Sequence, residues 1–136
     1  MPVLIDLHEK LLLLFLTGSS TAASAQDWTP YAQTSLATQY FDLQRAVAMG
    51  NTTAFIVDLH DLKTETRDPN GKTYLSVVYA TEFNCRKAVR RILSYQRMSE
   101  RMGNGAVVSE YTEVGEWSDV KAPGLTRLMT AACEQR

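Results

Sequence analysis

The segment AFIVDLHDLKTETRDPNGKTYLSVVYATEFNC, residues 54–85, decides the fold that we expect for this chain. Its first part, Ala54–Leu62, alternates apolar and polar side chains, and Phe55, Val57 and Leu59 fall on one side. The polar residues between them fall on the other side, because successive side chains of a strand point to opposite faces of the sheet. This pattern predicts a half-buried strand of an antiparallel sheet.

The tetrapeptide Asp68–Gly71 (DPNG) predicts a tight reversal after this strand. Pro69 fixes its own φ, and Gly71 accepts the positive φ that closes such a turn. The run that follows, Tyr74–Phe83 (YLSVVYATEF), has the composition of a returning strand. The two runs therefore form a β-hairpin.

Further elements are expected on both sides of this hairpin. Before and after it we predict an irregular entry at Trp28–Leu36, a strand at Thr38–Asp42 with Gln44–Met49 as its partner, and a strand at Ala106–Thr112. Turn signals at Gly50-Asn51 and Gly103–Gly105 separate these runs.

The run Ala88–Met98 (AVRRILSYQRM) fits two structures. Val89, Ile92 and Leu93 have the spacing of a helix face, whereas Val89, Leu93 and Tyr95 fit the alternation of a strand. Periodicity slightly favours a helix and leaves both interpretations open.

A helix is predicted at the C-terminal end of the chain. Pro123 suits its first turn, where the missing N–H costs no hydrogen bond. The apolar residues beyond it are spaced as on one helix face: Leu125, Leu128, Met129, Ala132 and Cys133. Cys133 therefore falls on the buried side, and we expect Trp117 to fill the space between sheet and helix.

The first 25 residues predict an export signal. Leu11–Leu16 (LLLLFL) follows Lys10 and leads to the small residues Ala23–Ala25, the pattern of a secretory signal with an A-x-A cleavage site. The alternative interpretation is an N-terminal core helix. We expect residues 1–25 to be a signal peptide and residues 26–136 to form a single domain.

The chain has two cysteines, Cys85 and Cys133. Export leads to an oxidising compartment in which thiols pair, and two cysteines allow only one connectivity. We therefore predict a disulfide between them, with two unpaired core cysteines as the alternative. The bond would tie the C-terminal helix to the end of the Tyr74–Phe83 strand.

The charge of the chain is balanced, with 14 Lys and Arg against 15 Asp and Glu. Removal of the signal leaves 13 of each. A net charge near zero produces no general attraction to nucleic acid or to anionic membranes. Outside the signal, no stretch approaches the ~20 apolar residues of a transmembrane helix. We expect neither a nucleic-acid partner nor membrane insertion.

No catalytic residue, metal site or cofactor is predicted. His60 is the only histidine beyond the signal and shares its strand face with Asp58, but a zinc site usually needs three or four ligands. A serine or cysteine hydrolase would need His60 as its base, and no serine lies in a nucleophile-elbow motif. Met102–Gly105 has too few glycines for a phosphate-binding loop. We interpret His60 and Asp58 as part of a solvated strand face, and the chain as not an enzyme.

Basic residues are concentrated in residues 86–101, which hold six cations and one anion. The densest group is Arg86, Lys87, Arg90 and Arg91. Such a cluster attracts an acidic protein segment or another polyanion. We predict that these four residues bind a protein partner, with a solvated face as the alternative.

Several landmarks occur in a recognisable order: Tyr79–Arg86 (YATEFNCR), the basic run to Ser94, Met102–Val108 (MGNGAVV), Trp117, Ala122–Gly124 (APG) and Cys133. In their order and spacing they resemble the surface-adhesin protein E family of Gram-negative bacteria, over nearly all of the chain beyond the signal. The resemblance implies an α+β fold: a single six-stranded antiparallel sheet with a C-terminal helix packed on one face and tied by the disulfide. It also makes Ala88–Met98 a strand.

The resemblance implies a function as well. The members that gave the family its name resemble adhesins for host extracellular-matrix proteins and plasminogen-system components, and by position Arg86 and Lys87 are the contact residues. We expect an exported, non-enzymatic binding module, an adhesin, with a protein partner. The alternative is a soluble periplasmic envelope protein of housekeeping or stress role that binds a bacterial envelope partner, because the sequence lacks a lipid-attachment cysteine for surface display.

Overall fold

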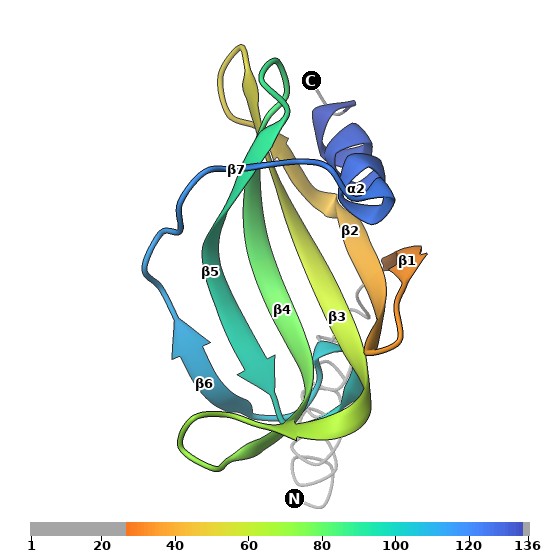
Figure 1. The fold of residues 1–136 in the computed structure, drawn as a ribbon, viewed down its shortest axis with the longest axis vertical. Helices are drawn as coiled ribbons and strands as arrows, with labels where there is room; N and C mark the ends of the chain where they lie inside the picture. Colours follow the sequence, from red (N-terminus) through yellow and green to blue (C-terminus); the bar gives the residue numbers. More distant parts are fainter. Residues whose placement is uncertain (1–26, 135–136) are drawn as a thin grey trace, which may run out of the picture.

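The computed structural model describes residues 27–134, so the predicted signal peptide, residues 1–25, lies outside the described residues. Six strands follow one another in chain order across one antiparallel sheet: β1 (Trp28–Gln33), β2 (Ala37–Ala48), β3 (Thr53–Arg67), β4 (Thr73–Asn84), β5 (Val89–Met98) and β6 (Val107–Tyr111). The two-residue strand β7 (Ser118–Asp119) pairs with the free part of β5, and the helix α2 (Pro123–Cys133) crosses one face of the sheet (Figure 1). The predicted fold class is confirmed.

The hairpin of β3 and β4 forms as predicted. A carboxylate oxygen of Asp68 accepts hydrogen bonds from the backbone N–H groups of Asn70 and Lys72, both at 2.9 Å. Gly71 has a φ of 83°, a conformation that glycine adopts without steric cost. The turn residues therefore close the loop locally, before any contact with the rest of the sheet is needed.

The start of the sheet differs from the prediction. Trp28–Gln33 is a strand and not an irregular entry, because its backbone pairs with β2 although its side chains show no alternation. Pro30 is tolerated there because β1 is an edge strand. Thr38–Asp42 and Gln44–Ala48 are not partners but parts of one strand, β2, which pairs with β3 on both sides of an interruption.

An irregularity between Asp42 and Ala46 made β2 look like two strands. The buried Asp42 carboxylate accepts hydrogen bonds there from the backbone N–H of Gln44 at 3.0 Å and from the Nε of Arg45 at 2.9 Å. These bonds satisfy polar groups that the interrupted ladder leaves without strand partners. The interruption bends the strand but does not end it.

The run Ala88–Met98 is a strand from Val89 onward, as the resemblance implied and against the weak helical periodicity. β4 pairs along its whole length on one edge, and β6 and β7 pair on the other. Ala88 has a φ of 52° and completes the tight turn from β4. Nonlocal pairing on both edges has therefore overridden the local spacing.

The main core lies between α2 and the sheet. Ile56 of β3, Phe83 of β4 and Leu128 of α2 are almost completely buried and pack together. Burial of each such side chain contributes roughly 1.5–3 kcal/mol. The predicted disulfide between Cys85 and Cys133 is present and joins the end of α2 to the end of β4. Within the described residues, no helix is long and apolar enough to cross a bilayer.

The opposite face of the sheet is also partly covered. A short 3-10 turn, η1 (Arg101–Gly103), lies over Ser76, whose hydroxyl accepts a hydrogen bond from the Gly103 N–H at 2.9 Å. The Asp61 carboxylate accepts another from the Met102 N–H at 2.8 Å. A Cβ on Gly103 would come within 3.1 Å of Val78, so the turn packs closely on the strands.

Removal of the disulfide should destabilise the fold strongly. The bond closes a loop between residues 48 apart, for which the chain-entropy model predicts about 4 kcal/mol. We expect a Cys85→Ala/Cys133→Ala variant to lose roughly that much unfolding free energy, measured by urea denaturation under non-reducing conditions. Reduced wild-type protein should match the variant, and equal stability of oxidised and reduced protein would contradict the expectation.

Candidate functional site

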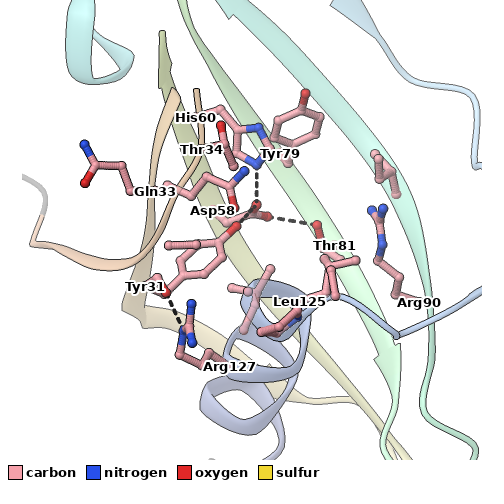
Figure 2. Close-up of a pocket in the computed structure, with 17 residues that line it drawn as sticks. Tyr31, Gln33, Thr34, Asp58, His60, Tyr79, Thr81, Arg90, Leu125 and Arg127 are labelled. Carbon is pink, nitrogen blue, oxygen red and sulfur yellow. Dashed lines mark hydrogen bonds and ion pairs between the residues drawn. The ribbon is translucent and has the colours of Figure 1, made fainter. Parts of the chain in front are cut away.

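A cavity of about 590 Å³ lies between the sheet and the N-terminal part of α2 (Figure 2). Its walls come from β1, β2, β3, β4 and β5 and from residues 122–128. Because successive side chains alternate in direction, only every second residue of β3 and β4 reaches this face. On β3 these residues include Asp58 and His60, and on β4 they include Tyr79 and Thr81.

Asp58 lies at the centre of the cavity floor and is almost completely buried. The Thr81 hydroxyl donates a hydrogen bond to one carboxylate oxygen at 2.9 Å, and the Tyr31 hydroxyl donates to the other at 3.3 Å. Burial disfavours the charged form and raises the pKa of Asp58 to about 7, although these hydrogen bonds act in the opposite direction. The Asp58 carboxyl group therefore exchanges its proton near neutral pH.

His60 follows Asp58 on the same face. Its Nε2 lies 3.7 Å from a carboxylate oxygen of Asp58, which is too long for a hydrogen bond. Its ring packs against Tyr79, with ring centres 4.7 Å apart. Burial, with a further contribution from the positive charge of Arg90, lowers the pKa of His60 to about 4. The imidazole is therefore neutral at pH 7.

The interpretation of Asp58 and His60 as a solvated strand face is wrong. The alternation correctly separated the two faces of β3, but it could not show that α2 and β1 cover the polar one. Both faces of β3 are in fact covered, since Leu59 on the other side is also buried.

Arg90 lines the same cavity from β5 (Figure 2). Its Nε is buried and has no hydrogen-bond partner within the described residues. An unpaired buried donor is uncommon in folded proteins and is costly. Arg90 thus supplies an unsatisfied cationic donor to an otherwise largely bonded polar cluster.

A row of aromatic rings extends from His60 of β3, in the cavity, through Tyr79 of β4 and across two further strands. Tyr79 is followed on β5 by Tyr95 at 5.6 Å between ring centres, and Tyr95 is followed by Tyr111 of β6 at 5.2 Å. The Arg97 guanidinium lies over the rings of Tyr95 and Tyr74. The sequence pattern does not reveal this row, because only the strand register brings these tyrosines together.

The four predicted binding residues are divided among three places. Arg86 and Lys87 are exposed in the turn between β4 and β5, where their backbone N–H groups donate to the side-chain oxygen of Asn84 at 3.1 and 3.0 Å. Arg90 lines the cavity. Arg91, the next residue along β5, points to the opposite face of the sheet.

Arg91 already has two partners. Its Nε lies 2.6 Å from a carboxylate oxygen of the buried Glu82, and its guanidinium stacks 4.5 Å from the centre of the Trp117 ring. Trp117 therefore does not fill the space between sheet and helix as predicted. It covers an ion pair on the other face and is itself exposed.

The polar groups of the cavity are arranged for recognition of a polar group. A carboxyl group whose pKa is raised to about 7, a neutral imidazole and a guanidinium whose buried Nε is unpaired line one cavity. Within residues 27–134, no three His, Cys, Asp or Glu side chains gather into a group that could hold a metal ion.

Comparison with known proteins identifies a family. The model of the family described as surface-adhesin protein E matches residues 28–134. No curated protein matches the sequence. Among solved structures, Haemophilus influenzae protein E is similar with a TM-score of 0.61 at 14% identity, over 82% of this chain and 90% of that one. Protein E from non-typeable Haemophilus influenzae has a TM-score of 0.58 at 12% identity, over 74% and 69%. At such low identity the structural likeness concerns the fold alone.

Two single variants should reveal opposite effects of pH on stability. The raised pKa of Asp58 means that its contribution to stability is present at low pH and is lost as the pH rises from about 4 to about 7. The lowered pKa of His60 means that the folded protein disfavours the charged imidazole, which the unfolded chain forms below about pH 6.5, so the contribution of His60 to stability rises with pH between about 4 and 6.5. In the wild type the two contributions largely cancel.

Relative to the wild type, Asp58→Asn should therefore gain stability as the pH rises from 4 to 7, and His60→Gln should lose it. We expect each change to be a few kcal/mol, because one pKa unit corresponds to about 1.4 kcal/mol. Urea denaturation at several pH values between 4 and 7.5 measures both profiles. For each variant, the unfolding free energy relative to the wild type is plotted against pH. Slopes of the same sign in the two variants would show that burial does not shift the pKa values of Asp58 and His60 in opposite directions.

Proposed function

This chain belongs to the surface-adhesin protein E family, and from that membership we propose that its mature domain is an exported, non-enzymatic adhesin that binds a protein partner. The match spans almost all of the described residues, so it applies to the whole domain and not to one motif. A sheet with a disulfide-bonded helix offers the rigid surface that such binding requires.

We place the contact at the turn that carries Arg86 and Lys87. Both residues are exposed, and neither side chain forms an ion pair with any described residue. Their backbone is already held by Asn84 and by the adjacent disulfide. Binding at a preorganised turn loses little conformational entropy, so more of the interaction energy appears as affinity.

The other two basic residues contribute differently to this proposal. Arg91 pairs with Glu82 and stacks on Trp117 on the face of the sheet opposite α2, and Arg90 lines the cavity. The four cations therefore do not form one patch. A partner with an acidic segment would meet Arg86 and Lys87 first, and electrostatic attraction would mainly raise its association rate.

We propose host extracellular-matrix or plasminogen-system proteins as partners, as the family relationship implies. The alternative partner is a component of the bacterial envelope. Cell fractionation separates the two, since an adhesin must be accessible at the cell surface. Protection of the protein from externally added protease in intact cells, with cleavage after outer-membrane permeabilisation, would favour the periplasmic alternative.

Charge reversal at the turn should weaken binding selectively. We expect Arg86→Glu/Lys87→Glu to reduce affinity for immobilised matrix proteins at least tenfold, about 1.4 kcal/mol, in surface plasmon resonance. The wild-type affinity should fall as salt is increased, because exposed charges are screened. The matched control is Lys63→Glu/Lys72→Glu, which makes the same change in charge at exposed residues outside the turn.

The control variant should bind like the wild type. Equal loss in both double variants would indicate a general effect of net charge, and full binding by the Arg86/Lys87 variant with its fold intact would remove this turn from the interface.

A further inference from the structure

We propose that the cavity between the sheet and α2 binds a small organic carboxylate with an apolar body. This site is separate from the turn at Arg86 and Lys87 and uses none of its residues. It would provide a second binding activity, directed at a small molecule and not at a protein surface.

The size and walls of the cavity suit an apolar body. Its volume of about 590 Å³ falls within the ~300–1,000 Å³ typical of small-molecule sites. Ile92 of β5 and Leu125 and Leu128 of α2 line it, together with Pro123 at the start of the helix. A hydrocarbon chain or a ring placed against these side chains would be removed from water, which is favourable in proportion to the apolar area buried.

The charged groups of the cavity favour an anionic head. The cations that line it are Arg90 and Arg127, against a single acidic residue, Asp58. Both oxygens of Asp58 already accept hydrogen bonds from Thr81 and Tyr31, so the carboxyl group is held within the protein. The remaining charge is positive and would attract a carboxylate.

Arg90 supplies the donor that such a head requires. Its Nε is buried without a partner in the described part of the chain, and a buried donor is normally bonded. Arg127 differs, because its Nε already donates to the backbone oxygen of Tyr31 at 2.6 Å. A guanidinium matches the planar, two-oxygen geometry of a carboxylate, so Arg90 is the residue that would recognise the head.

The start of α2 adds to this preference. Pro123, Gly124 and Leu125 line the cavity, and no side chain caps the helix at Ala122. The first N–H groups of a helix have no intrahelical acceptor and carry a partial positive charge. The absence of a side chain on Gly124 lets this end approach β1, since a Cβ there would lie 3.0 Å from Ala32. The helix end therefore favours a negatively charged group in the cavity, as Arg90 does.

Isothermal titration calorimetry with matched ligands tests the proposal on the full mature domain. Octanoate combines the two features, 1-octanol keeps the chain without the charge, and acetate keeps the charge without the chain. 3-Phenylpropionate replaces the chain with a ring and distinguishes the two kinds of apolar body. We expect at least one of the two larger carboxylates to bind at one per chain, and octanol and acetate to bind at least tenfold more weakly.

Variants assign the binding to the cavity. Arg90→Gln should weaken carboxylate binding at least tenfold and leave octanol unchanged, while Arg90→Lys, which keeps the charge, should weaken it less. Ile92→Trp should block the binding of both the carboxylates and octanol, because the larger side chain fills the cavity. Arg97→Gln is the matched control, because Arg97 belongs to the same strand but does not line the cavity.

Thermal denaturation and the intact disulfide verify the fold of each variant. Absence of binding by both larger carboxylates would overturn the proposal, as would equal affinity for octanoate and octanol. Unchanged carboxylate binding in folded Arg90→Gln or Arg90→Lys protein would also overturn it. None of these outcomes bears on the matrix-protein assay at Arg86 and Lys87, so the two proposals fail independently.

Discussion

The disulfide between Cys85 and Cys133 holds the C-terminal helix against the sheet. The helix it holds has only eleven residues and buries Leu128 and Ala132 completely or nearly so. So short a helix is marginal by itself in water and needs its tertiary contacts. The disulfide keeps the C-terminal end of α2 at the end of β4, while residues at the N-terminal end of the helix line the cavity. The same helix, α2, therefore packs over both the core and the cavity.

Burial beneath α2 changes the pKa values of two side chains of β3. An Asp and a His on an open sheet would keep ordinary pKa values, whereas here burial raises that of Asp58 to about 7 and lowers that of His60 to about 4. The cost of burying Asp58 is partly offset by two hydrogen bonds from Tyr31 and Thr81, which come from different strands. A buried polar cluster with shifted pKa values inside a small domain is typical of a functional site more than of a purely structural core.

Strand alternation divides one basic run into parts with different surroundings. Adjacent residues Arg90 and Arg91 point to opposite faces, so one lines the cavity and the other is held by Glu82 beneath Trp117. Arg86 and Lys87 precede the strand and stay exposed in the turn. The two binding activities that we propose, for a protein at the turn and for a small carboxylate under the helix, arise from this division.

The elements that could be predicted from the sequence are those whose signals are local. The hairpin follows from alternation in β3 and the turn at Asp68–Gly71, the helix follows from Pro123 and its apolar face, and the disulfide follows from two cysteines that come after a predicted export signal. Tertiary structure alone decided that β1 is a strand, that β2 is continuous, where Trp117 lies, and that Asp58 and His60 are enclosed with Arg90. These features depend on strand register and on which face the helix covers. Neither is encoded in neighbouring residues, because both result from contacts between segments far apart in the chain.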